Sequence, residues 1–278
     1  MDRRDSDATE VDPVAVSAED VARADRIVQI FAPVRFELPA PTETRLRAMS
    51  DYMRSSPKST GHLATCRGKD WLTAMSEQIF GAFREGLVAV HYHLARITAI
   101  ERSITEIANA HRDELFIDGN VLVGFFCRPL NTEYQAFKFA VRRTLEYLAG
   151  AAAMYFKTEG NRIRKLGVTI DGREPRDRSR SVQARLAASN LIDVIGADNE
   201  KSVRDVLAHY ASVHAGAVNI HAGPDRTVLV RLVGGGEEFQ PFGEPKTSSL
   251  SAILPREVTW LEDLAFGVFG DLGLLPDS

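Results

Sequence analysis

The sequence predicts a mainly α protein, an elongated antiparallel helical bundle with a small β hairpin inserted before the last helix. Apolar residues recur at steps of three and four over residues 69–112, which is the spacing of an amphipathic helix. A second stripe of this kind covers residues 132–157 after a short connection. Two long helices joined in this way should lie side by side, so a bundle is the expected architecture.

Composition and charge limit the classes of function. Of the 278 residues, 44% are hydrophobic and 26% are charged, as in an ordinary folded domain. A net charge of -4 gives the whole molecule no positive field that would attract nucleic acid or anionic lipid. Without an apolar run of signal or membrane-spanning length, we expect a cytoplasmic protein that makes no membrane contact. Cys66 and Cys127 lie far apart and predict neither a disulfide framework nor a zinc site.

Residues 1–60 are expected to form a polar N-terminal segment with one or two short helices. A capping box at 17–20 opens the first, which Pro33 ends, and residues 42–53 form the second. A loop rich in Ser, Pro and Gly then leads to the bundle domain at 69–278.

The long helix of residues 69–112 would extend about 60 Å at the usual rise, so we expect Gly81 or Gly86 to kink it. Residues 115–126 are interpreted as a turn and a buried connection. A capping box at 132–135 then predicts a helix that runs to about Lys157.

Residues 157–180 are predicted to be a basic loop with a short strand around 168–170. The segment has eight basic and four acidic side chains and is interrupted by glycines and Pro175. Such a surplus of positive charge can follow a phosphate backbone. The candidate RNA-binding residues are Arg173, Arg176, Arg178 and Arg180.

The C-terminal third alternates between helix and strand patterns. Two helices are expected at 181–195 and 199–213, followed by a hairpin at about 217–233 and a loop at the three glycines 234–236. Pro255 in a first helical turn predicts a last amphipathic helix to about Leu272.

Several signatures of cofactor and metal chemistry are missing from the sequence. No phosphate-binding loop, dinucleotide fingerprint, zinc-protease motif or esterase elbow is present, and we expect no cofactor. His91 and His93 are two residues apart on a helix and point in different directions, so they cannot share a metal ion. We expect one of these rings at the edge of the core, the other in solvent, and no metal site.

The candidate catalytic site is the run Arg204-Asp205-Val206-Leu207-Ala208-His209. It resembles the Arg-x(4–6)-His motif of the HEPN superfamily, a group of helical-bundle proteins of which many are ribonucleases. About two matches to this pattern are expected by chance, and Arg84 with His91 forms the second one. The 204–209 run is favoured because a polar residue, Asp205, follows its arginine and because one further helix follows it near the end of the chain.

The residues of this run suit metal-independent RNA cleavage. Asp205 and His209 are four apart on one helical face, so the carboxylate can orient the imidazole. His209 would then be the general base that removes the proton from the ribose 2′-hydroxyl. Arg204 would bind the phosphate and stabilise the charge that develops on its oxygens.

The resemblance also implies an assembly and a biological setting. Arg204 and His209 lie about 140° apart around one helix, so a single helix cannot easily direct both at one phosphate. Members of the family commonly build the site across a dimer, and we expect a homodimer with RNA as substrate, in a toxin or defence setting with a protein antidote as partner. Two alternatives stay open, a non-catalytic helical dimerisation or regulatory scaffold and an RNA-binding module without cleavage.

Overall fold

The computed structural model describes residues 36–56, 61–63, 70–115, 123–125, 127–158, 162–189, 191, 217–222, 228–233 and 249–276. Contacts divide the chain into residues 1–37 and a compact unit that begins at Leu38, and the description below concerns the second unit. The expected helix before Pro33 lies outside the described residues. The described part is mainly α, as predicted.

The long helix predicted for residues 69–112 is present as one continuous run, α4 (Trp71–Glu77), the π-helical segment η2 (Gln78–Phe83) and α5 (Arg84–Ala110). Asp70 caps its start by accepting a hydrogen bond from the Thr73 amide at 2.9 Å. Gly81, one of the two glycines at which a kink was expected, lies in η2, and Gly86 lies in α5. The short helix α6 (Arg112–Leu115) follows after His111.

Helix α7 (Arg128–Tyr155) runs antiparallel to the long helix. It begins one turn before the predicted capping box, because Pro129 suits a first helical turn. The two helices approach closely at two glycines: a Cβ on Gly86 would lie 2.5 Å from the Thr144 hydroxyl oxygen, and one on Gly150 would lie 2.9 Å from the Gln78 amide nitrogen. Small residues thus set the spacing of this pair.

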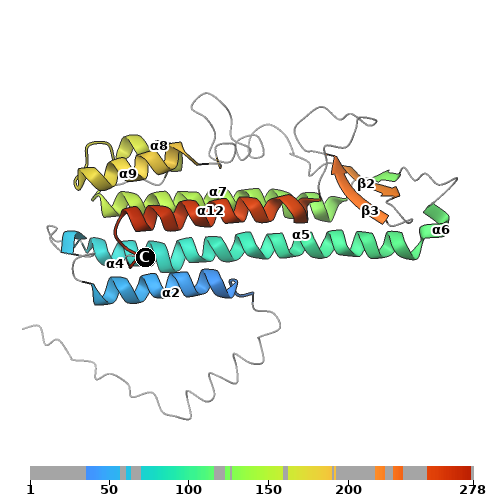
Figure 1. Ribbon diagram of the computed structural model, residues 1–278, viewed down its shortest axis with the longest axis horizontal. Coiled ribbons are helices and arrows are strands. Elements are labelled where there is room, and N and C mark those ends of the chain that lie inside the picture. Colours follow the sequence, from blue (N-terminus) through green and yellow to red (C-terminus); the bar gives the residue numbers. More distant parts are fainter. Residues whose placement is uncertain are drawn as a thin grey trace, which may run out of the picture. The chain divides into compact units, whose positions relative to one another are not determined.

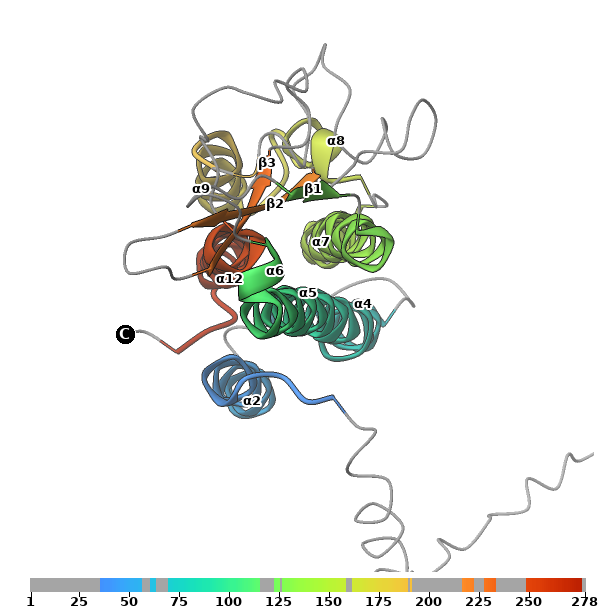
Figure 2. The same ribbon diagram turned by 90° about the vertical axis from the view of Figure 1, so that its right-hand side faces the viewer.

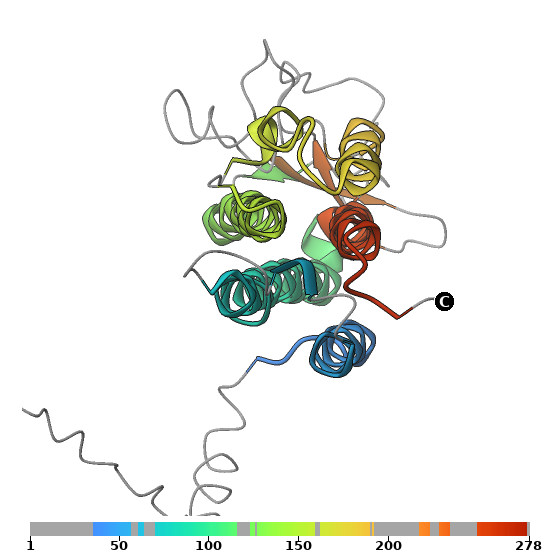
Figure 3. The same cartoon turned by 90° about the vertical axis from the view of Figure 1, so that its left-hand side faces the viewer.

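Helices α2 (Ala40–Ser55) and α12 (Leu250–Asp271) complete the core. In the end-on views, α2 lies below α5, and α7 and α12 lie side by side above it (Figures 2 and 3). Leu46 and Met49 of α2 are fully buried, so this helix belongs to the bundle, which therefore starts well before the expected boundary at residue 69. The long helices are covered within one chain, and the exposed large apolar side chains of the described residues are scattered: Tyr92, Ile107, Phe139, Val168 and Ile253.

Helix α12 begins at Leu250, one turn earlier than predicted, and Pro255 lies inside it. Glu101 of α5 explains this early start. Its carboxylate, only 5% exposed, accepts hydrogen bonds from the amides of Leu250 at 2.7 Å and Ser251 at 2.9 Å. A buried anion therefore caps the positive end of α12 from another helix.

The prediction of a basic loop and a short strand over residues 157–180 is wrong. The chain instead forms α8 (Ile163–Thr169) and, after a turn, α9 (Arg176–Ala187), which lie along the outer side of α7 and α12 (Figure 1). Ile163 and Leu166 of α8 and Ile170 directly after it are buried at helical spacing, which outweighs the weakening effect of Gly167 inside the helix.

Three short strands lie near the end of α5 that is opposite to α4 (Figure 1). Strands β2 (Ala217–Ala222) and β3 (Val228–Val233) pair antiparallel, with Ala217 opposite Val233. Strand β1 (Val123–Phe125), in the segment expected to be a connection, pairs with β2 and gives the order β1-β2-β3.

Candidate functional site

The predicted catalytic residues Arg204, Asp205 and His209 lie outside the described residues. Their segment follows α9 in the chain and precedes β2 and α12. The expected helix at 199–213 that would carry them lies outside the described residues as well.

The four predicted RNA-binding arginines divide into two groups. Arg173, Arg176 and Arg180 are exposed, in the turn before α9 and in its first turns. Arg176 forms an ion pair with Glu174 at 2.9 Å, and both side chains are about 70% exposed, so the pair is weak and screened. These three side chains can reach a polyanion.

Arg178 turns inward and has a structural role. Its guanidinium donates hydrogen bonds to the Tyr155 hydroxyl and to the Leu272 carbonyl, which ties α9 to α7 and to the end of α12. Burial raises the pKa of the Tyr155 hydroxyl, although the charge of Arg178 opposes the shift. Gly273 makes room for this arginine, because a Cβ there would lie 2.8 Å from a guanidinium nitrogen. Arg178 is therefore removed from the RNA-binding set.

His91 and His93 each contact a carboxylate at a helix interface, and neither side chain is exposed, so the expectation that one ring lies in solvent is wrong. The His91 Nε2 atom is 2.9 Å from a Glu262 carboxylate oxygen of α12, and the His93 Nδ1 atom is 2.7 Å from one of Glu133 on α7. The two rings point to different helices, as their spacing requires. Among the described residues, no cluster of histidine, cysteine or carboxylate side chains could hold a metal ion.

Glu262 also accepts a hydrogen bond from the Thr42 hydroxyl at 2.8 Å, which connects α2 to α12. Burial opposes ionisation of this carboxyl. The hydrogen bonds from His91 and Thr42, with the charges of His91 and Arg45, outweigh burial and lower its pKa. The group is thus ionised and engaged in packing.

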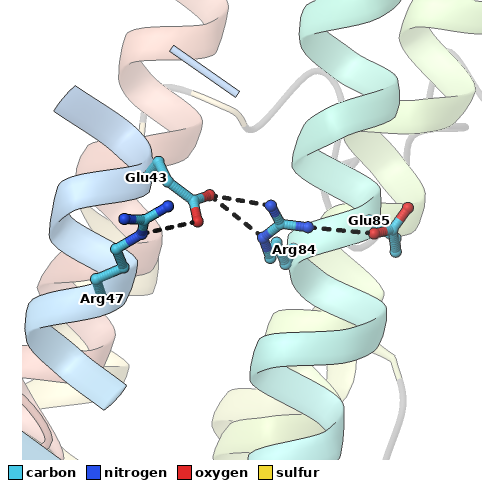
Figure 4. Close-up of polar contacts among 4 residues, drawn as sticks. All are labelled: Glu43, Arg47, Arg84 and Glu85. Atoms are coloured by element: carbon cyan, nitrogen blue, oxygen red, sulfur yellow. Dashed lines mark hydrogen bonds and ion pairs between the residues drawn. The ribbon is translucent and has the colours of Figure 1, made fainter. Parts of the chain in front are cut away.

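Arg84, the arginine of the second motif match, also has structural partners. Its guanidinium donates to Glu43 of α2 at 3.1 Å and contacts Glu85 at 3.4 Å, and Arg47 contacts the other oxygen of Glu43 (Figure 4). Arg84 therefore holds α2 against α5, and His91 holds α12 against it.

A cavity of about 510 Å³ opens between α9 and α12, within the range of small-molecule sites. The α9 side is formed by small residues at helical spacing and by Arg185, and the α12 side contributes an aromatic ring and two carboxylates. The lining residues are Ser181, Ala184, Arg185, Ala188, Ser189, Trp260, Asp263, Leu264 and Asp271.

Arg185 is paired with an acidic side chain at this cavity. Its guanidinium makes two hydrogen bonds to Asp271, at 2.6 and 3.0 Å, and these bonds raise its pKa further. Gly267 allows the guanidinium to lie on the backbone of α12, since a Cβ there would overlap it. Asp271 neutralises the arginine, so the remaining charge of the described lining is that of Asp263.

Asp263 is exposed and has no hydrogen-bond or ion-pair partner within the described part of the chain. Trp260, one turn earlier on α12, is half-buried, with the Arg256 guanidinium 5.0 Å from its ring centre. The sequence analysis missed this site, because small residues on one helix and an isolated tryptophan on another carry no periodic signal. The only available signal was the spacing of residues 260, 263, 267 and 271, which share one face of a helix.

The chain has no significant match among protein-family models, curated proteins or solved structures. None of the described helices is both long enough and apolar enough to cross a bilayer.

Proposed function

We propose that this protein is a metal-independent ribonuclease of HEPN type, with Arg204, Asp205 and His209 as its catalytic residues. The observation that carries the proposal is the place of the 204–209 run in the chain. It follows a bundle of long antiparallel helices and is itself followed by one further long helix, α12, which packs into the core. This is the order that the HEPN resemblance implies.

In the proposed reaction His209 accepts the proton of a ribose 2′-hydroxyl, and the 2′-oxygen attacks the adjacent phosphorus. The bond from phosphorus to the 5′-oxygen of the next nucleotide breaks, and that oxygen takes up a proton from water. The products carry a 2′,3′-cyclic phosphate and a 5′-hydroxyl. Arg204 stabilises the negative charge on the phosphate oxygens, and Asp205 stabilises the imidazolium.

The exposed arginines at the start of α9 support a contact with RNA. Arg173 in the preceding turn and Arg176 and Arg180 in the helix are the predicted RNA-binding residues that point to solvent, and α9 leads in sequence to the 204–209 run. Replacing all three with Glu should weaken RNA binding and flatten its dependence on salt. An unchanged affinity would remove this surface from the proposal.

The proposed active site is shared between two protomers. Since the described apolar faces are covered within one chain, this part of the proposal depends on the separation of Arg204 and His209 around one helix. Mixing Arg204→Ala protein with His209→Ala protein should restore roughly a quarter of the activity, because half of the dimers then hold one intact site of two. No recovery on mixing, or a single species of about 31 kDa in sedimentation, would contradict a shared site.

Single variants test the chemistry. His209→Ala and Arg204→Ala should each reduce RNA cleavage on the order of 10² to 10³-fold, and Asp205→Asn should fall between these variants and the wild type. His111→Ala and Arg47→Ala are matched controls, because these side chains are 58% and 76% exposed. Intact RNA after incubation with the wild-type protein would instead favour the scaffold or the RNA-binding module.

A further inference from the structure

The cavity between α9 and α12 combines features that packing does not require. Ser181 and Ala184 of α9, and Ala188 directly after it, are small and exposed and leave an open groove opposite Trp260. Here a carboxylate without a described partner, Asp263, lines the same space.

The groups in the lining select a planar ligand that donates hydrogen bonds. Trp260 offers an aromatic face, and Asp263 lies three residues further along the same helix, within reach of the edge of a ring stacked there. A carboxylate only accepts hydrogen bonds. Because Asp271 occupies Arg185, the described lining carries one net negative charge, which disfavours a phosphate group inside the cavity and leaves the phosphate of a bound nucleotide outside it.

We propose that this cavity binds a guanine base of single-stranded RNA, stacked on Trp260 and hydrogen-bonded to Asp263. Guanine is the common base whose pairing edge presents two adjacent N–H donors, which match the two oxygens of one carboxylate. Adenine and cytosine place an acceptor beside their amino group, and uracil has a single N–H between two carbonyls. The proposal rests on RNA being the substrate and adds a base-specific subsite, so cleavage should favour positions near a guanosine.

The test is a binding measurement that needs no cleavage. Trp71→Phe protein retains Trp260 as its only tryptophan, so its fluorescence reports on this cavity. Titration with GMP should give saturable quenching, with AMP binding roughly tenfold or more weakly, and ribose 5-phosphate should give none. In this background Asp263→Asn should weaken GMP binding roughly tenfold or more, and Ala188→Leu should block it.

Asp51→Asn, on the exposed face of α2, is the matched control and should bind GMP as the parent does. Equal quenching by GMP and AMP, quenching by ribose 5-phosphate, or GMP binding that survives Asp263→Asn would overturn the proposal. Binding of an arginine-rich peptide in place of GMP would likewise overturn it and assign the cavity to a protein partner.

The two proposals fail in different ways. If His209→Ala protein no longer cleaves RNA but still binds GMP, the result supports both the ribonuclease and the base site. If the wild-type protein binds GMP but leaves RNA intact, the ribonuclease proposal is wrong and the proposal of a base site stands. Cleavage without GMP binding, and without any change of cleavage position in Asp263→Asn protein, removes the base site alone.

Discussion

The interface between α5 and α7 differs from the interface between α9 and α12 in how it uses glycines and polar side chains. In the first, Gly86 and Gly150 bring the helices close, and the polar residues there are satisfied: Thr144 donates to the Ala140 carbonyl, and Gln78 donates to that of Tyr147. In the second, Gly267 admits Arg185, yet an open space and the carboxylate of Asp263 remain. The first interface satisfies its polar groups, and the second leaves Asp263 without a partner among the described residues.

The largest expected effect on stability comes from Glu101, a carboxylate that is buried in the core. Glu101→Ala should lower the free energy of unfolding by about 3 kcal/mol, because it leaves the amides of Leu250 and Ser251 without their acceptor. Urea denaturation measures this. Glu106→Ala, at an exposed position of the same helix, should change it by less than about 0.5 kcal/mol. Equal losses in the two variants would show that Glu101 does not cap α12.

Three glycine substitutions rank the two interfaces directly. Gly86→Ala should cost about 2 kcal/mol, because the new methyl group meets both the side chain and the backbone of buried Thr144. Gly267→Ala should cost less, since Arg185 is 40% exposed and can move aside. Gly81→Ala meets nothing within 4 Å and should be neutral or stabilising. A larger loss at Gly267 than at Gly86 would reverse the comparison.

Acid should weaken the core through Glu262. Its pKa is lowered in the folded state, so its contribution to stability is complete above the ordinary glutamic acid pKa of about 4.3 and is lost as the pH falls below it. Thermal unfolding between about pH 3 and pH 6 should therefore show a shallower acid-side decline for Glu262→Gln than for the wild type. Identical slopes would mean that the contacts with His91 and Thr42 do not hold this carboxylate ionised.

The smallest effect on stability is expected at the cavity. Ala188→Leu fills open space and should change the free energy of unfolding by no more than about 0.5 kcal/mol, in either direction. A loss of several kcal/mol in calorimetry or urea denaturation would mean that Ala188 is needed for packing, and the contrast between the interfaces would disappear.

Much of the bundle could be predicted from the sequence because burial leaves a periodic trace. Leu87, Val90 and Ile97 recur at helical spacing, and each is fully buried. Helix α8 and the first turns of α9 were missed because glycines, Pro175 and a high density of charge are typical of loops, whereas residues 181–187 of α9 lie within the helix predicted at 181–195. The apolar residues of α8 were the available counter-signal.

The candidate sites depend on tertiary contacts that spacing does not reveal. Arg178 differs from Arg176 only through its partners Tyr155 and Leu272, which come from distant parts of the chain. Trp260 and Asp263 become a site because small residues of α9 lie opposite them. Conversely, the chemistry of Arg204 and His209 could be proposed from residue type and spacing, and it remains a prediction.

The chemical ends of the RNA products test the central claim most directly. Mass spectrometry of RNA incubated with the wild-type protein in EDTA should find 2′,3′-cyclic phosphate and 5′-hydroxyl ends, which attack by the 2′-hydroxyl produces. The same ends should be absent with His209→Ala protein. Products with 5′-phosphate and 3′-hydroxyl ends, or cleavage that stops in EDTA, would contradict a metal-independent ribonuclease built on Arg204 and His209.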